Sequence, residues 1–129
     1  MFILESTYDG AGTIVENTLL MTDAEAGARG EAMVAASGKL TKCGATAIPQ
    51  YVLNKTTAAG TSVAQEYISV REDQIFLADY TGTAPVVGTK GYQIDATGLL
   101  VNGALSTGGQ VEIVSVDTTK SKCRVKFIK

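Results

Sequence analysis

The chain has 129 residues, of which 45% are hydrophobic and 19% are charged, and its formal net charge is −2. This length suits one domain, and the composition is typical of a globular protein and excludes a disordered chain. No apolar run approaches the roughly 20 residues that a transmembrane helix needs. The small negative charge offers no general attraction for a polyanion. We therefore expect a protein with neither a membrane nor a nucleic acid as its partner.

The residues that most catalytic sites require are missing from the sequence. There is no histidine, which excludes catalytic triads built on an imidazole base. The two cysteines, Cys43 and Cys123, are isolated, whereas a zinc site usually needs four ligands with close paired spacing. We expect no enzyme, no cofactor and no metal site. We interpret both cysteines as small core residues, with a disulfide as the alternative.

The first 25 residues are interpreted as an extended arm ahead of a single β domain of residues 26–129. The beginning lacks the basic start and long apolar stretch of a secretory signal, so we expect synthesis in a cytoplasm. An apolar tip followed by a glycine-containing break usually docks on a surface, either of its own domain or of a neighbour. The candidate partner-binding residues at this tip are Phe2, Ile3, Leu4 and Tyr8.

Within the arm, Thr22–Glu25 has the form of a capping box and predicts the start of a helix. Gly27 and Gly30 follow closely, and each costs about 1 kcal/mol in a helix interior. We therefore expect at most one short helical turn here.

From residue 31 onward the pattern predicts strands joined by turns. Residues 32–36 and 40–43 flank a turn with a glycine, and residues 92–95 and 99–101 flank a similar one, so each pair predicts a hairpin. Two further strands are expected at residues 63–70 and 74–80, separated by three charged residues.

The last predicted hairpin joins residues 111–116 to residues 122–128. In the return strand, period-two alternation places one set of side chains on the core face, namely Cys123, Val125 and Phe127. The opposite face carries Lys122, Arg124 and Lys126. This basic stripe is either a solvated outer surface or a contact for an acidic partner, and its three residues are candidate partner-binding residues.

Charge is distributed unevenly along the chain. Residues 1–37 contain six acidic residues against one arginine, whereas residues 118–129 contain five basic residues and no acid. The acidic residues are Glu5, Asp9, Glu16, Asp23, Glu25 and Glu31. Ends of opposite sign predict pairing, either within one molecule or between neighbouring copies.

The segment from residue 30 to the end resembles the small head decoration proteins of tailed phages, also called capsid cement proteins. The resemblance extends over about 100 residues and lies in the general composition, rich in Ala, Gly, Thr and Val, and in short segments. It lies in GEAMV (30–34), SGKLTKC (37–43), IPQYVL (48–53), ISVR (68–71), DQIF (73–76), VGTKGY (87–92), IDATGLL (94–100) and the terminal hairpin.

The resemblance implies a mainly β fold, a small β-barrel or β-sandwich-like domain with an extended N-terminal arm. It implies a structural virion protein, made in the host cytoplasm, that sits on the capsid exterior and bridges subunits of the major capsid protein. Self-association as a homotrimer, or as a dimer, is also implied. The family offers no catalytic residues.

Two alternatives stay open. One is another phage structural protein, such as a tail or head-fibre component. The other is a small β module that binds a ligand or carbohydrate. The second is weakened by an aromatic content of only 6% and the lack of tryptophan, because sugar rings stack on aromatic side chains.

Overall fold

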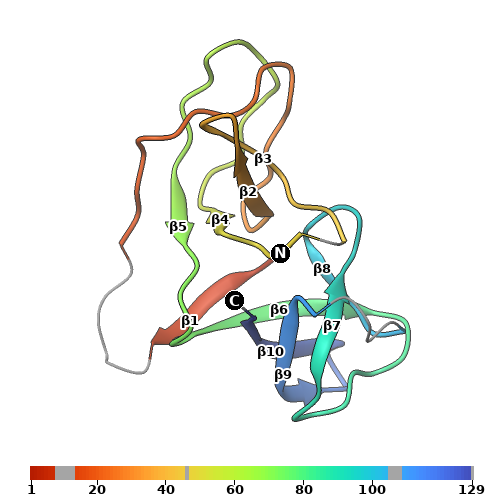
Figure 1. Cartoon of the computed structure of the whole chain (residues 1–129). Coiled ribbons are helices and arrows are strands. Elements are labelled where there is room, and N and C mark those ends of the chain that lie inside the picture. Colours follow the sequence, from red (N-terminus) through yellow and green to blue (C-terminus); the bar gives the residue numbers. More distant parts are fainter. Residues whose placement is uncertain (8–13, 46, 105–108, 129) are drawn as a thin grey trace.

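The computed structural model describes residues 1–7, 14–45, 47–104 and 109–128, which form ten β-strands and no helix (Figure 1). The six-stranded sheet contains β1 (Ile3–Thr7), β6 (Gln74–Thr81), β7 (Lys90–Ile94), β8 (Leu100–Asn102), β9 (Val111–Asp117) and β10 (Lys122–Phe127). The four-stranded sheet contains β2 (Ala32–Ala36), β3 (Lys39–Lys42), β4 (Tyr51–Leu53) and β5 (Tyr67–Ser69). The predicted mainly β fold is confirmed. Within the part of the chain that the structure describes, no helix has the length and hydrophobicity needed to cross a membrane.

The six-stranded sheet closes into a barrel. Its strand order is β1-β6-β10-β9-β7-β8, and β8 also pairs in parallel with the second half of β6, from Asp79 to Thr81. β6, β10, β9, β7 and β8 therefore form a closed ring of five strands. β1 lies outside the ring, along the first half of β6. The prediction of a small β-barrel is thus confirmed.

An aromatic cluster fills one part of the barrel interior. The ring of Phe127 lies between those of Phe2 and Phe76, with centroid distances of 5.0 and 5.1 Å. Tilted and edge-on contacts at this distance suit the quadrupoles of the rings. The N-terminal residues thus contribute directly to the barrel core.

The predicted hairpins are present. β2 and β3 pair around Ser37 and Gly38, which have φ angles of 51° and 76°, the positive values that a two-residue hairpin turn requires. β7 pairs with β8, and β9 pairs with β10. Of the strand predicted at residues 63–70, only β5 (Tyr67–Ser69) forms. β5 belongs to a different sheet from β6.

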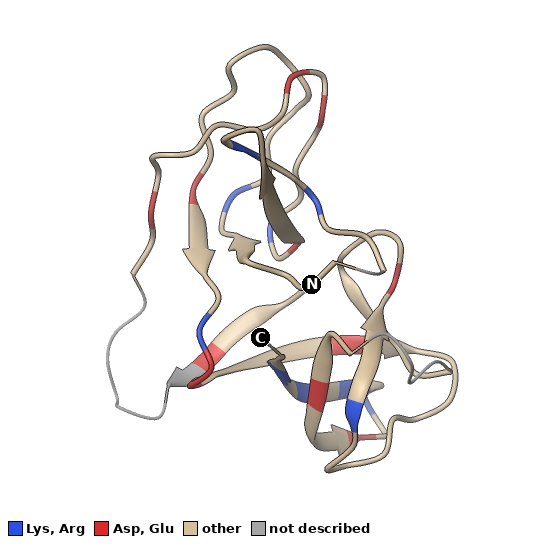
Figure 2. Ribbon diagram, viewed as in Figure 1, with Lys and Arg blue, Asp and Glu red and all other residues tan. Residues whose placement is uncertain are grey.

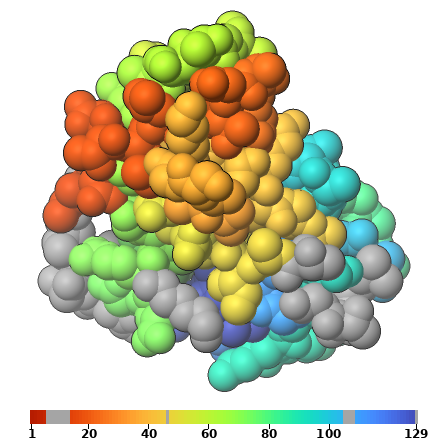
Figure 3. Space-filling view, turned by 45° about the horizontal axis from the view of Figure 1, so that its top comes forward, coloured from red at the N-terminus to blue at the C-terminus, as the bar shows by residue number. Residues whose placement is uncertain are grey.

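Residues 14–27, called the strap, close the four-stranded sheet. At one end, Glu16 and Tyr67 of β5 exchange backbone hydrogen bonds of 2.8 and 2.9 Å. At the other end, the amide of Leu40 in β3 donates to Leu20 O at 2.8 Å and its carbonyl accepts from Thr22 N at 2.9 Å. β5 and β3 are the two outer strands of this sheet, so the strap gives each of them a hydrogen-bonded neighbour. Figure 3 shows the strap, in red to orange, lying against the lighter orange β2–β3 hairpin.

The strap also covers the second core. Met21 is fully buried, and its side chain belongs to a cluster separate from the barrel interior. The buried members of this cluster are Met21, Met33, Leu40, Leu53 and Tyr67.

No helical turn forms at residues 22–25, so the prediction that the capping-box pattern starts a helix is wrong. These residues form an irregular turn in which Ala24 has a φ of 63°. The groups that would cap a helix are engaged with β3 instead, since the Thr22 amide and hydroxyl both donate to Leu40 O. The Glu25 carboxylate accepts from the Thr41 hydroxyl at 2.8 Å and from Lys42 N at 2.7 Å.

Backbone hydrogen bonds join the two sheets. Ala32 N, at the start of β2, donates to Gly98 O in the turn between β7 and β8, at 2.9 Å. Buried Gln110 adds a second connection, because its side-chain amide donates to Gly44 O and Ala47 O while its oxygen accepts from Ile94 N. Phe2 N also donates to Gly30 O, and Gln93 Nε2 donates to Ala45 O, so several hydrogen bonds tie the barrel to the strapped sheet.

Candidate interaction surface

The structure separates the four apolar residues predicted at the N-terminal tip. Phe2 is 2% exposed and lies in the barrel core, because its ring packs on Phe127. Leu4 is half-buried against the same core. Ile3 points to the other side of β1 and is 45% exposed. Tyr8 lies outside the described residues. Phe2 and Leu4 therefore dock on their own domain, whereas Ile3 presents an exposed apolar side chain.

The outward side chains of β1, β6, β10 and β9 form one surface, called here the charged face. The register places Ile3 opposite Leu77 on one side of β6 and Arg124 opposite Leu77 on the other. Candidates from the two ends of the chain therefore meet across one strand. The charged face consists of Ile3, Glu5, Leu77, Asp79, Glu112, Ser115, Lys122, Arg124 and Lys126.

The basic stripe on this face is paired with acidic side chains. Arg124 Nε lies 2.7 Å from Glu5 Oε1, although the two residues are 119 positions apart. Lys122 Nζ lies 2.7 Å from Asp79 Oδ1 on β6. Lys126 stands opposite Glu112 in the β9–β10 ladder, and Figure 2 shows acidic and basic residues on neighbouring strands of the barrel. One ion pair, Arg124–Glu5, thus joins the oppositely charged ends within one molecule, whereas Asp79 and Glu112 come from the middle of the chain.

The acidic residues of the strap serve a different purpose. The Glu16 carboxylate accepts a hydrogen bond from the Ser69 hydroxyl of β5. Asp23 Oδ1 accepts from Ser62 N and lies 3.1 Å from Lys39 Nζ. The Ser62 N–H and the Lys39 ammonium hold the pKa of Asp23 below its ordinary value. These carboxylates fasten the strap to the sheet, which sequence reasoning missed because their donors lie far along the chain.

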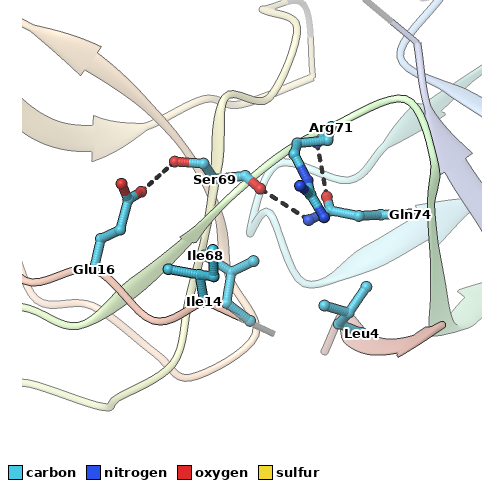
Figure 4. Close-up of a pocket in the computed structure, with 7 residues that line it drawn as sticks. All are labelled: Leu4, Ile14, Glu16, Ile68, Ser69, Arg71 and Gln74. Atoms are coloured by element: carbon cyan, nitrogen blue, oxygen red, sulfur yellow. Dashed lines mark hydrogen bonds between the residues drawn. The ribbon is translucent and has the colours of Figure 1, made fainter. Parts of the chain in front are cut away.

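A small hollow opens between β1, the strap and β5 (Figure 4). Its volume is about 160 Å³, and it is lined by Leu4, Ile14, Glu16, Ile68, Ser69, Arg71 and Gln74. Figure 4 shows Ile14 and Ile68 next to each other and Leu4 apart from them, below Gln74. The polar groups bond to one another, since Gln74 donates to Ser69 O and accepts from Arg71 N. The hollow is smaller than the 300–1,000 Å³ typical of ligand pockets.

A larger, shallower hollow of about 430 Å³ lies beside β4 and β5. Its lining is uncharged and contains one aromatic side chain, Tyr51, whose ring makes an edge contact with Tyr67 at 5.1 Å. The complete lining is Ile48, Pro49, Gln50, Tyr51, Ser69 and Val70. This hollow has the size of a ligand pocket but few groups to orient a ligand.

Both cysteines are core residues, as predicted. Cys43 and Cys123 are buried free thiols. Burial raises the pKa of Cys43 to about 12 and that of Cys123 to about 11. Since the thiolate is the reactive form, and both thiols stay protonated near neutral pH, neither cysteine is activated as a nucleophile.

Two further observations bear on the kind of site. Among the residues that the structure describes, no group of three or more acidic, cysteine or histidine side chains is arranged to hold a metal ion. Comparison with known proteins gives no match, whether to a family model, a curated protein or a solved structure.

Proposed function

We propose that this chain is a structural virion protein that decorates the exterior of a tailed-phage icosahedral capsid and bridges neighbouring major capsid subunits. The observation that carries the proposal is the convergence of candidate contact residues on the charged face. Ile3 from one end of the chain lies on β1, and Lys122, Arg124 and Lys126 from the other end lie on β10. The two strands flank β6, so these residues share one sheet surface. The resemblance of residues 30–129 to capsid cement proteins provides the biological context.

The charged face suits a non-covalent contact in which no reaction is catalysed. Its ion pairs are held on hydrogen-bonded strands, so little backbone entropy is lost when a partner docks. Ile3, 45% exposed, supplies an apolar contact beside the Arg124–Glu5 pair. Each copy would bury a modest area, and repetition over a symmetric shell together with attachment as a trimer or dimer would multiply the effect.

The construction of the molecule also suits a clamp. A clamp between shell subunits must transmit force without deforming. The barrel is a closed ring of strands, and the second sheet is closed by the strap. Force applied to β6, β10 or β9 of the charged face would therefore be shared among strands that are hydrogen-bonded on both sides, whereas β1 would pass it to β6.

Co-sedimentation with empty, expanded capsids of a cognate phage tests the proposal. Wild-type protein should bind saturably at a fixed ratio to capsid subunits. Ile3→Asp and Arg124→Glu should each weaken binding at least about tenfold, since both place an unfavourable charge in the contact. Lys55→Glu is the matched control, because Lys55 is exposed on the loop between β4 and β5. Absence of wild-type binding to the cognate shell refutes the function, and unchanged binding by both face variants refutes the charged face as the contact.

The ligand-binding alternative rests on the hollow beside Tyr51. A glycan array is the direct test, and Tyr51→Ala is the variant that should abolish any signal. Binding to tail or head-fibre components instead of the shell would move the protein to the other structural class. Glycan binding that depends on Tyr51, or binding to tail or head-fibre components, would refute the decoration proposal if the protein also failed to bind capsids.

A further inference from the structure

Glu31 is a buried carboxyl group between the barrel and the strapped sheet. Its side chain is 3% exposed. Oε1 accepts a hydrogen bond from Ala28 N at 3.2 Å. Oε2 is buried without any hydrogen-bond partner, and it is the only such side-chain atom among the residues that the structure describes. A buried acceptor left unsatisfied is costly, and more so when it carries charge.

The surrounding backbone leaves this carboxyl little room. Glu31 N donates to Ala28 O at 3.0 Å, and its carbonyl accepts from Leu53 N of β4 at 3.0 Å. The next residue, Ala32, donates to Gly98 O of the β7–β8 turn. A Cβ atom added to Gly98 would lie 3.2 Å from Glu31 Cγ. The Glu31 side chain therefore lies in close contact with Gly98, at the point where the β7–β8 turn is hydrogen-bonded to the second sheet.

Few charged groups compensate Glu31. Lys42, at the end of β3, favours the ionised form, and Glu25 of the strap opposes it. Cys43 lies near enough for the Glu31 charge to influence its thiol. In the β7–β8 turn, Asp95 Oδ1 accepts from Thr97, Leu99 and Leu100 and is occupied within the turn. Burial outweighs the other influences and raises the pKa of Glu31 above that of an ordinary glutamate.

We propose that Glu31 is a proton-operated latch between the two sheets. The contact between the two sheets around Gly98 and Ala28, called the seam, accommodates the neutral carboxyl group. The ionised carboxylate weakens this contact. The folded protein therefore holds a proton that the unfolded chain releases more readily. The stabilisation is fully present below the ordinary glutamate pKa and is lost as the pH rises through the raised pKa of the folded state. The seam is tightest in mildly acidic solution. This inference does not depend on the proposed function.

Carbon-detected NMR of the glutamate carboxyl groups tests the latch in the unmodified protein. Glu66 is the internal reference, because it is exposed and its carboxylate accepts none of the hydrogen bonds described above. The Glu31 carboxyl should titrate at a higher pH than that of Glu66, and the amides of Ala32 and Gly98 should shift with the Glu31 midpoint. A Glu31 midpoint at or below that of Glu66, or amides that do not follow it, overturns the proposal.

Glu31→Gln gives an independent readout, because it keeps the Oε1 acceptor for Ala28 N but cannot ionise. In urea unfolding, its unfolding equilibrium constant should match that of wild type near pH 4 and fall about tenfold below it at pH 7.5, the size expected for a buried charged acceptor without a hydrogen bond. Glu66→Gln should show no such pH-dependent difference. A Glu31→Gln protein that loses stability relative to wild type as the pH rises overturns the latch. Should this variant fail to fold, the titration decides.

Discussion

The barrel and the strapped sheet solve the same problem in different ways. Both are sheets whose outer strands need hydrogen-bonding partners. The barrel obtains them by pairing β8 with β6, so that regular strands complete the ring. The four-stranded sheet obtains them from an irregular segment, the strap, which is held by backbone contacts and by the carboxylates of Glu16, Asp23 and Glu25.

This difference separates two sources of stability. Barrel closure depends on apolar burial and backbone ladders, neither of which requires a charged side chain. Strap closure depends in addition on carboxyl groups that accept hydrogen bonds from hydroxyl and amide groups. We therefore expect the two regions to respond differently to mutation, acid and salt.

The largest effect should come from the barrel core. Phe127→Ala removes the ring that contacts both Phe2 and Phe76, and it should lower the free energy of unfolding by about 4 kcal/mol. Urea unfolding followed by circular dichroism measures this change. Val87→Ala, at a side chain that is 57% exposed, is the control and should change stability by less than about 0.5 kcal/mol. A loss below about 1 kcal/mol for Phe127→Ala would show that the ring cluster is not central to the barrel.

A moderate and local effect is expected in the strap. Glu25→Ala removes the acceptor for the Thr41 hydroxyl and Lys42 N and should cost about 1–2 kcal/mol. Native-state hydrogen exchange should accelerate at Thr22 and Leu40, while Val125 in the barrel keeps its protection. Glu66→Ala is the matched control. Equal acceleration in both sheets would contradict the idea that the strap closes its sheet separately.

A smaller effect is expected on the charged face. Arg124→Gln breaks the ion pair between Arg124 and Glu5, whose side chains are 49% and 28% exposed, respectively. It should lower the free energy of unfolding by less than about 1 kcal/mol. The difference from wild type should shrink further in about 1 M salt, where the screening length is about 3 Å. Unfolding in low and high salt measures both. A loss above about 2 kcal/mol would mean that this pair holds β1 on the barrel.

The smallest effect should be at Asp23, and its sign depends on pH. The Ser62 amide and Lys39 lower the pKa of Asp23. Asp23 therefore stabilises the folded protein above the ordinary aspartate pKa, and this stabilisation disappears as the pH falls through the lowered pKa of the folded state. Asp23→Asn should therefore differ slightly from wild type at pH 7 and converge with it in acid. Urea midpoints between pH 2 and pH 7 test this. A difference that grows in acid would contradict the assignment.

Local features of the fold could be predicted from the sequence, but long-range pairings could not. Gly38 and the alternation of Cys123, Val125 and Phe127 indicate hairpins because turn chemistry and side-chain period act between neighbours. The parallel pairing of β6 with β8 depends on barrel closure, and no period in either strand specifies its partner.

The candidate site shows the same limit. Alternation placed Lys122, Arg124 and Lys126 on one face, but it did not reveal that Glu5 and Asp79 would lie beside them. Phe2 was predicted as a contact residue because its apolar side chain lies near the start of the chain, and only the three-dimensional packing shows it in the core. The capping-box pattern at Thr22–Glu25 was misread because the same side chains serve β3.

One edge of β6 is occupied in turn by two strands. β1 pairs along it up to Leu77, and β8 begins at Asp79, so Ala78 alone separates the two pairings. A β1 strand that slid along β6 by two residues, the smallest slip that keeps Ile3 outside and Leu4 inside, would collide with Leu100. β8 is therefore an end stop for β1 and excludes the nearest misregistered form of the sheet in that direction.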